Sequence, residues 1–298
     1  MDSERPELAT AIQASLGQPV DAVAPLASGA GGDAHLVTLR SGTRVVVKVG
    51  RGSPPDLFDR EAAGLSWLAE ASAIRVPHVL AVRHAAPAFI AMEFIEAGPR
   101  SPTFERDFGR QLAELHRHHP PRFGLDCDNF IGPLPQHNAP ASGETFADFY
   151  AERRLIPLLD QVASGVLERS DHRAVESTAA TLADRIPVES PARLHGDLWA
   201  GNRLVGPQGE PVLIDPAVYG GHREMDLAMM QLFGGFGAEA FAAYDEAYPL
   251  EAGWRARTPL MQLYPLLVHC ALFGRAYVGQ LRTALEACNG SKRGFLGV

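Results

Sequence analysis

The chain has 298 residues, of which 46% are hydrophobic and 21% charged, and its formal net charge is −8. That length suffices for one large domain or two lobes, and an acidic chain without a Lys/Arg cluster argues against nucleic acid or an anionic membrane as its main partner. Three widely spaced cysteines, Cys127, Cys270 and Cys288, argue against a disulfide framework and a thiolate metal site. The acidic stretch 1–9 is no signal peptide, so the cytoplasm is the expected location.

The N-terminal part of the chain predicts a β-rich unit. Its expected elements are a helix, three strands, a second helix and two further strands, at 3–16, 20–49, 56–72, 78–84 and 88–95. The glycine-rich stretch 29–32 and the pair Ser41-Gly42 are typical of the turns that would join the first three strands. The stretch 97–102, which contains Gly and Pro, indicates a linker.

After this linker the chain is predicted to be mostly helical, at 104–119, 145–165, 171–185, 224–235, 238–248 and 254–287. Thr145 and Asp148 have the spacing of a capping box at the start of the second of these helices. The stretch 203–214 is the exception and predicts a small hairpin. The most apolar late stretch, 260–274, is too short for a membrane span and contains polar residues and a proline, so it predicts a buried, kinked helix.

Together these elements predict an α+β protein with two lobes. A small antiparallel sheet would form the N-lobe over 1–95, and a larger, mainly helical lobe would cover 96–298. We expect the first lobe to bind nucleotide, and the second lobe to carry out catalysis and bind the acceptor.

Residues suited to phosphoryl transfer from ATP occur in the expected order, beginning in the β-rich part. Gly29, Gly31 and Gly32 lie between two strands, where glycine lets the backbone approach phosphates, although a loose hairpin turn has the same pattern. Lys48 interrupts an apolar strand, and Glu61 lies beside the apolar stripe of the next helix. Each would satisfy the other, and the lysine could then hold phosphate. Taken separately, each is more typical of an exposed side chain.

The stretch "HGDLWAGN" carries the strongest signal. Asp197 and Asn202 have the spacing of a kinase catalytic loop, in which the aspartate takes the proton of the acceptor hydroxyl and the asparagine oxygen suits Mg²⁺. Asp215 follows an apolar strand and could hold the same metal, although a turn after a strand would also explain it. His195 is expected to brace the loop. Trp199 is either a core residue or a flat wall for a sugar with a nearby ammonium group.

Further candidates flank these motifs. Met92 could fill the space behind adenine, while the backbone of Glu93, Phe94 and Ile95 could contact it; an edge strand leading into a linker has the same pattern. Three polar residues after Asp215 could contact an acceptor: His222, Arg223 and Glu224.

In this order, the motifs resemble the fructosamine/ketosamine kinase family. That family belongs with the aminoglycoside phosphotransferases and choline kinases, which share a protein-kinase-like fold. The wider resemblance rests on Lys48, Glu61, "HGDLWAGN" and Asp215. The family resemblance rests on longer segments: "FDREAAGLSWLA", "FGLDCDNFIGPLPQHN", "FADFYAERRLIPLL" and "LIDPAVYGGHREMDLAMMQLFGGF".

The resemblance implies ATP- and Mg²⁺-dependent phosphorylation of the carbon-3 hydroxyl of a ketosamine, a fructosamine or a ribulosamine, after which the product sheds its sugar. It implies that Asp197 is the base, that Asn202 and Asp215 bind metal, that Lys48 with Glu61 binds phosphate and that Asp226 anchors the catalytic loop. Many relatives carry a cysteine in the glycine-rich loop that is linked to redox control. That loop is "SGAGGDAH" in this chain, which puts such a switch in doubt.

Two other functions remain open from the sequence. The first is a small-molecule kinase of the same fold that acts on an aminoglycoside, choline or another sugar. The second is a pseudokinase, which would be expected to have lost one of four residues that are all present: Lys48, Asp197, Asn202 and Asp215. The sequence does not distinguish a free amino acid from a protein lysine as the amine of the substrate, and it leaves the oligomeric state open.

Overall fold

The computed structural model describes residues 4–29, 32–50, 52–143 and 145–290. It divides into two compact units. The sheet unit comprises Met1–Phe104 and Arg203–Pro216, and the helical unit comprises Glu105–Asn202 and Ala217–Val298. This division differs from the predicted boundary at 95/96, because 96–104 and the segment after Asn202 both belong with the sheet.

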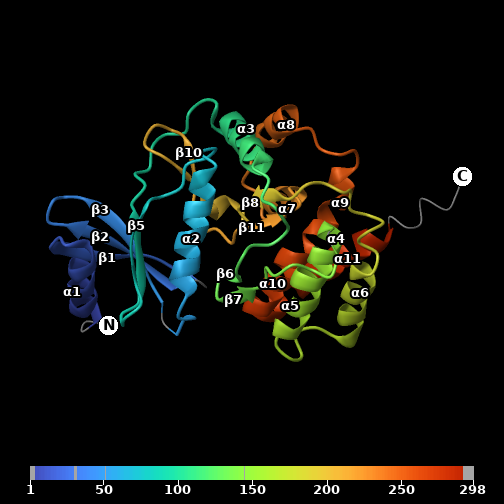
Figure 1. The fold of residues 1–298 in the computed structure, drawn as a ribbon, viewed down its shortest axis with the longest axis horizontal. Helices are drawn as coiled ribbons and strands as arrows, with labels where there is room; N and C mark the ends of the chain where they lie inside the picture. The colour runs from blue at the N-terminus through green and yellow to red at the C-terminus, as the bar shows by residue number, and fades with distance from the viewer. Residues whose placement is uncertain (1–3, 30–31, 51, 144, 291–298) are drawn as a thin grey trace, which may run out of the picture. The chain divides into compact units, whose positions relative to one another are not determined.

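The sheet unit contains a five-stranded antiparallel sheet in the order β1-β2-β3-β5-β4 (Figure 1). Its strands are β1 (Val20–Gly29), β2 (Gly32–Leu39), β3 (Arg44–Val49), β4 (Val79–Arg83) and β5 (Phe89–Glu93). Helix α1 (Glu4–Leu16) and helix α2 (Leu57–Glu70) complete this part. The predicted elements are all present, with ends shifted by a few residues.

The two helices cover opposite faces of this sheet. Val45 and Val47 of β3 share a buried apolar core with Leu8 and Ile12 of α1. Because side chains alternate along a strand, Lys48 points to the other face, where it reaches α2. The sheet therefore separates an apolar side from a side that carries charge.

The predicted hairpin at 203–214 forms as β9 (Arg203–Val205) and β10 (Pro211–Leu213) and is bound to the sheet unit. The Leu213 N–H donates to the Arg75 carbonyl at 2.9 Å. The Arg75 guanidinium lies between Glu93 of β5, at 2.5 Å, and Glu210 of the hairpin, at 2.6 Å. These contacts explain why the hairpin belongs with the sheet although the helical unit surrounds it in sequence.

The helical unit is built around one large buried cluster that extends from Ile131 to Cys288. Its helices are α3 (Phe104–Arg117, beginning at the unit boundary), α4 (Phe146–Tyr150), α5 (Ile156–Gln161), α6 (Arg169–Ala179), α7 (Glu224–Leu232), α8 (Ala238–Ala247), α9 (Trp254–Met261), α10 (Leu263–Phe273) and α11 (Val278–Gly290). The apolar helix α10 packs against α5 and α11 (Figure 1).

Two predicted helices are interrupted. The helix expected over 254–287 divides into α9, α10, the 3₁₀ turn Gly274–Tyr277 and α11, and Gly274 has a φ of +67°. The helix expected over 145–165 contains the π-helical turn Ala151–Leu155 between α4 and α5. The predicted capping box is confirmed, because the Thr145 side chain and the Asp148 backbone N–H pair at 3.2 Å and the reciprocal bond is present.

Two short hairpins of the helical unit have no counterpart in the predicted elements. They pair β6 (Asn129–Ile131) with β7 (Leu134–Gln136), and β8 (Ala192–Leu194) with β11 (Tyr219–Gly221). Each strand has only three residues, too few for an alternating pattern to be recognisable.

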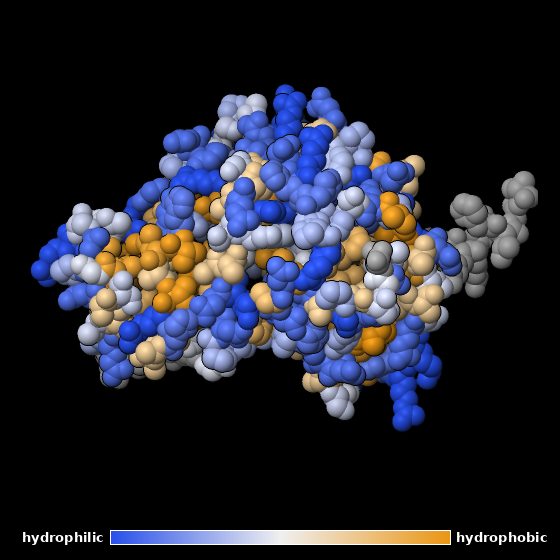
Figure 2. All heavy atoms as spheres, in the orientation of Figure 1, coloured by the Kyte–Doolittle hydropathy of each residue, from blue (hydrophilic) through white to orange (hydrophobic). Residues whose placement is uncertain are grey.

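No helix within the described ranges is long and apolar enough to cross a bilayer. The face of the molecule in Figure 2 is largely hydrophilic, and its apolar residues form small patches.

Candidate active site

Lys48, Glu61 and Asp215 form one ionic cluster in the sheet unit. The Lys48 ammonium lies 2.6 Å from Glu61 Oε1 and 2.5 Å from Asp215 Oδ1. Lys48 comes from β3, Glu61 from α2, and Asp215 follows β10, where it adopts a φ of +55°. The predicted pair of lysine and helix glutamate is therefore present, and the aspartate predicted to bind metal joins it.

Burial and charge set the protonation of this cluster. Burial disfavours the charged lysine, but Glu61 and Asp215 outweigh it and raise the pKa of Lys48. Burial also raises the pKa of Glu61, with Lys48 acting in the opposite direction. Asp215 is 40% exposed, in contrast to 15% for Lys48, so it is the member of the cluster that solvent and ligands can reach.

The glycine-rich turn closes beside the end of β3. Gly29 and Gly32 are paired at the ends of β1 and β2. Gly32 has a φ of +120°, and a Cβ there would lie 2.6 Å from the Val49 carbonyl oxygen, so only glycine fits. Gly31 lies outside the described residues. Gly32 at the start of β2 therefore lies next to Val49, the residue that follows Lys48 in β3.

Asp226 of α7 binds the backbone of the loop that carries Asp197. Its carboxylate accepts the backbone N–H groups of His195 at 2.8 Å and Gly196 at 2.9 Å. His116 of α3 lies 3.2 Å from the same carboxylate, and the Tyr244 hydroxyl lies 2.8 Å from the other ring nitrogen of His116. Burial alone would raise the pKa of Asp226, but these partners lower it, so the anchor stays ionised. No motif in the sequence identified His116.

The loop orients Asp197 and Asn202 toward one another. The Asp197 N–H donates to His195 Nδ1 at 3.3 Å, which supports the bracing role predicted for this fully buried histidine. The Asn202 amide nitrogen donates to the Asp197 carbonyl at 2.9 Å and to its carboxylate at 3.3 Å. These bonds direct the amide nitrogen of Asn202 to Asp197 and its oxygen away from it, as a metal-binding role requires.

The segment after Asp215 lies against the catalytic loop within the helical unit. The Ala217 N–H donates to the His195 carbonyl at 2.9 Å. Gly196 has a φ of +84°, and a Cβ there would lie 1.9 Å from the Ala217 carbonyl oxygen. No other residue fits this contact, so the glycine of "HGD" permits the close approach of the two segments.

Trp199 is exposed, so its interpretation as a core residue is wrong. Its side chain is 42% exposed, and its ring lies over Gly201, where a Cβ would be 2.2 Å from the indole. Gly235, just after α7, similarly approaches the side chain of Ala200. The end of α7 therefore lies beside the loop next to Trp199.

The helical unit also contains an aromatic cluster that was not predicted from the sequence. Its ring centroids lie between 4.7 and 6.4 Å apart, and its members are Phe233, His269, Phe273 and Tyr277. Phe233 is 38% and Phe273 52% exposed. The i, i+4, i+8 spacing of His269, Phe273 and Tyr277 was a signal that could have identified it.

The three residues predicted to contact an acceptor are buried, which contradicts that prediction. Arg223 forms two bonds to Glu189, at 2.8 and 2.9 Å, and Glu224 pairs with Arg257 at 2.5 Å. His222 is 1% exposed, and burial lowers its pKa to about 4. In this structure these side chains stabilise the start of α7 and are closed to a substrate.

The four residues predicted to surround adenine, 92–95, differ in their burial and in the contacts that they make. Met92 and Ile95 are 4% and 7% exposed. The Glu93 N–H donates to the His78 carbonyl at 2.8 Å, and its carboxylate binds Arg75, so neither is available to adenine. The Arg44 guanidinium lies 4.7 Å from the centre of the Phe94 ring.

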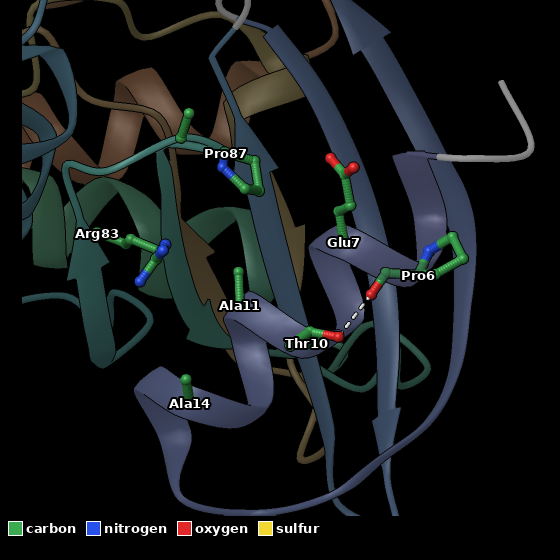
Figure 3. A pocket seen from close by; sticks show the side chains of 8 residues that line it. Pro6, Glu7, Thr10, Ala11, Ala14, Arg83 and Pro87 are labelled. Carbon is green, nitrogen blue, oxygen red and sulfur yellow. Dashed lines mark hydrogen bonds between the residues drawn. The ribbon is translucent and has the colours of Figure 1, made fainter.

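A pocket of about 450 Å³ lies elsewhere in the sheet unit. It is lined by Pro6, Glu7, Thr10, Ala11, Ala14, Arg83, Ala86 and Pro87, so it lies between α1 and the β4–β5 turn (Figure 3). Helix α1 covers the face of the sheet opposite to Lys48. This pocket is therefore separate from the ionic cluster.

The cysteines and carboxylates of the described ranges add little metal-binding capacity. No group of three or more His, Cys, Asp or Glu side chains in those ranges is placed to hold a metal ion. Cys127 is exposed and unbonded, while Cys270 and Cys288 are buried thiols. Burial raises the pKa of Cys270 to about 11, which keeps this thiol protonated.

Comparison with known proteins places these features in a family. A family model described as fructosamine kinase matches residues 5–290. The "Probable ketoamine kinase" of Enterococcus faecium is 38% identical over 234 residues, which cover 77% of this chain and 82% of that protein. The chloroplastic protein-ribulosamine 3-kinase of Arabidopsis thaliana is 37% identical over 239 residues, with coverage of 78% and 72%.

Solved structures agree. A structure from Thermobifida fusca described as a fructosamine-3-kinase superposes with a TM-score of 0.85 at 40% identity, covering 95% of this chain and 98% of its own. Choline kinase LicA of Streptococcus pneumoniae, at 18% identity, superposes with a TM-score of 0.65 over 96% of this chain and 99% of its own, and shows that the fold is shared. The chain therefore belongs to the fructosamine kinase family and has its protein-kinase-like fold.

Proposed function

We propose that this kinase transfers the γ-phosphoryl group of ATP to the carbon-3 hydroxyl of a ketosamine, a fructosamine or a ribulosamine. The phosphorylated product would then shed its sugar and release the amine, which amounts to deglycation. The observation that carries the proposal is the Lys48–Glu61–Asp215 cluster, because a lysine fixed between a helix carboxylate and a partly exposed aspartate matches the phosphate-binding part of kinases.

The ionic cluster and the catalytic loop supply the groups that nucleotide binding requires. Glu61 holds the Lys48 ammonium in place to bind the α- and β-phosphates of ATP. Asp215 and Asn202 offer hard oxygen ligands, which suit Mg²⁺. The two carboxylates around Lys48 carry one more negative charge than the single ammonium offsets, which favours the binding of an additional cation. When bound, Mg²⁺ would neutralise charge on the transferred phosphoryl group.

Asp197 would act on the acceptor. Its carboxylate orients the sugar hydroxyl and accepts its proton as the oxygen–phosphorus bond forms and ADP leaves. The Asn202 amide, at 3.3 Å, holds one carboxylate oxygen, and the Asp226 anchor keeps the loop in place. Proton acceptance therefore falls to a side chain whose backbone and carboxylate are both constrained.

The exposed aromatic residues near the loop suit the two halves of a ketosamine. Trp199 presents a flat apolar wall to the C–H face of a sugar, and aromatic faces attract a secondary ammonium. Phe233 and Phe273 are further exposed aromatic side chains of the helical unit that would suit the amine substituent of the acceptor. The names of the relatives, a ketoamine kinase and a ribulosamine 3-kinase, support the same class of acceptor.

The test is a panel of acceptors incubated with Mg-ATP and followed by mass spectrometry. The panel contains fructosyl-lysine, ribulosyl-lysine, a glycated peptide, an aminoglycoside, choline and free fructose, with Asp197→Asn as the control enzyme. We expect a mass increase of one phosphate on a ketosamine, with NMR placing it on carbon 3. Higher kcat/KM for any non-ketosamine acceptor would reject the ketosamine assignment and leave only a kinase of another small molecule.

We further propose that the reaction takes place in the cytoplasm, where thiols stay reduced. The three cysteines within the described ranges are all unpaired, which supports this location. Cell fractionation with an antibody to the protein tests it.

A further inference from the structure

Arg154 is a buried arginine whose position depends on an unusual turn. It is 1% exposed and lies in the π-helical turn Ala151–Leu155. Its guanidinium lies 4.6 Å from the centre of the Phe149 ring, 4.1 Å from that of Tyr219 and 5.5 Å from that of Tyr264. π-Helical turns are frequent at functional sites, yet none of the roles proposed above uses this residue.

The guanidinium begins a chain of buried hydrogen bonds. Arg154 Nη2 donates to Asn138 Oδ1 at 2.8 Å, and Asn138 Nδ2 donates to Asn129 Oδ1 at 2.7 Å. Gln136 Nε2 donates to the same Asn129 oxygen at 2.8 Å, and the Tyr264 hydroxyl donates to Gln136 Oε1 at 2.8 Å. Apart from Tyr264 of α10, these side chains come from the segments "DNFIGPLPQHN" and "FADFYAERRLIPLL".

This network ends on two backbone carbonyls. Asn129 Nδ2 donates to the Val218 carbonyl at 2.8 Å, and Gln136 Nε2 donates to the Ala217 carbonyl at 3.1 Å. Ala217 is the first residue of the helical unit after the chain leaves Asp215 and Pro216. Its carbonyl also lies against Gly196, immediately before Asp197. The network therefore holds residues 217 and 218 where the chain passes Gly196 of the loop.

We propose that Arg154, Asn138, Asn129 and Gln136 form a positioning network for phosphoryl transfer. By holding the Ala217 and Val218 carbonyls, the network fixes this segment of the helical unit against Gly196, immediately before Asp197. None of the four touches ATP or acceptor in this scheme. The proposal rests on the proposed kinase function, and it gives a role to four buried polar side chains of these two segments.

The buried positive charge of Arg154 supports a positioning role for the network. Burying an arginine costs several kcal/mol that its partners must offset, and apolar replacements of buried ionic groups are often neutral or stabilising. A purely structural site would therefore have no need of the guanidinium. A site that must fix one backbone position does benefit, because Gln136 Nε2 bonds both Asn129 Oδ1 and the Ala217 carbonyl and so ties the buried network to that position.

The experiment compares three variants of the full chain. Gln136→Met removes the bond to Ala217 at nearly constant volume, and Arg154→Met removes the head of the network. Asp171→Asn is the matched control, because Asp171 is also buried and charged, with bonds to Arg282 at 2.8 and 2.9 Å, but contacts α11 and not the 217–218 segment. Thermal unfolding, kcat, both KM values and the Mg²⁺ concentration for half-maximal activity are measured for each.

We expect kcat to fall ten- to a hundredfold in Gln136→Met and Arg154→Met, since small displacements of catalytic groups cost that much. The concentration of Mg²⁺ required should rise severalfold, while KM for ATP stays within about twofold. Asp171→Asn should lower the melting temperature and leave kcat unchanged. If Arg154→Met fails to fold, the comparison with the control is made with Gln136→Met alone, because that substitution removes no charge.

A kcat in Gln136→Met equal to that of the control would overturn the proposal. Hydrogen–deuterium exchange of the 215–219 amides gives a second readout that needs no acceptor, with faster exchange expected in the two network variants than in the control. Equal exchange in all three would also overturn it. If ketosamines are not phosphorylated but another acceptor is, the same comparison is made with that acceptor, so this inference and the ketosamine assignment fail separately.

Discussion

The Lys48 ammonium lies 2.5 Å from the Asp215 carboxylate, so that a single side chain joins the third strand of the sheet to the residue after the β9–β10 hairpin. The same ammonium binds Glu61 at 2.6 Å. Lys48 therefore serves as the shared counterion of two carboxylates that are far apart in sequence. Its removal should therefore affect stability as well as the proposed phosphate binding.

Lys48→Met should lower the free energy of unfolding by on the order of 3 kcal/mol, because it leaves the Glu61 carboxylate buried without its cation. Adding Glu61→Leu should restore part of this loss. Urea denaturation of the two single variants and the double variant measures the coupling. A double variant as unstable as the sum of the single variants would show that the pair makes no net contribution.

Asp197→Asn should reduce kcat by about a hundredfold to ten-thousandfold, the usual contribution of a general base. ATP affinity should persist, because Asp197 is assigned to the acceptor. Steady-state kinetics and nucleotide titration by calorimetry separate the two effects. Near-normal turnover in this variant would remove Asp197 from the mechanism.

Activity should disappear with a chelator and return with Mg²⁺ or Mn²⁺, because Asn202 and Asp215 are hard oxygen ligands. Asp215→Ala should not recover when Mg²⁺ is raised within the low-millimolar range. The assay follows ADP release against metal concentration for the unmutated enzyme and the variant. Turnover that persists in chelator would contradict the assignment of both residues.

Trp199→Ala should raise the KM for a ketosamine more than the KM for ATP, because the exposed indole is assigned to the sugar. Phe273→Ala should have a similar effect only for ketosamines with a long amine substituent. Val188→Ala is the control, since Val188 is 88% exposed in the same unit and lies outside the aromatic cluster. Equal changes in both KM values would place Trp199 outside the acceptor site.

Stability should fall as the pH is lowered below about 6.5, because burial lowers the pKa of His222 to about 4 from the 6.5 of an unfolded histidine. The unfolded chain binds a proton in that window and the folded chain does not, so acidification favours unfolding, by about 2 kcal/mol between pH 7 and pH 5. Denaturant melts across this range, repeated with His222→Gln, measure the contribution. The variant should show a flatter profile; identical profiles would assign the pH dependence to other groups.

The sequence predicted those parts of the site whose chemistry depends on local spacing. The Lys48–Glu61 pair could be inferred because a charged group in an apolar element needs a partner, and the Thr145 capping box could be inferred from its spacing. The Asp226 anchor was implied by the family resemblance. The sheet and the β9–β10 hairpin followed from alternation and turn residues. These rules depend on residues that are close in sequence, and they also hold in the folded structure.

The remaining features depend on contacts between distant segments. Arg223 and Glu224 look like exposed polar residues in sequence, but Glu189 and Arg257 turn them into buried pairs. Arg154 likewise gives no sign of burial until Tyr219 and Tyr264 surround it. Such partners lie 33 or more residues away along the chain, so no local pattern identifies them.

The chain crosses between the two units after Phe104, Asn202 and Pro216. A fragment that ended at residue 104 would keep Lys48 and Glu61 but lack Asp215, and the complementary fragment would carry a hairpin that belongs to the other unit. The lobes of two related enzymes therefore cannot be recombined at a single point in the gene. A functional chimera must transfer 203–216 together with the N-terminal segment. We therefore expect the two units of this enzyme to be inherited together during evolution.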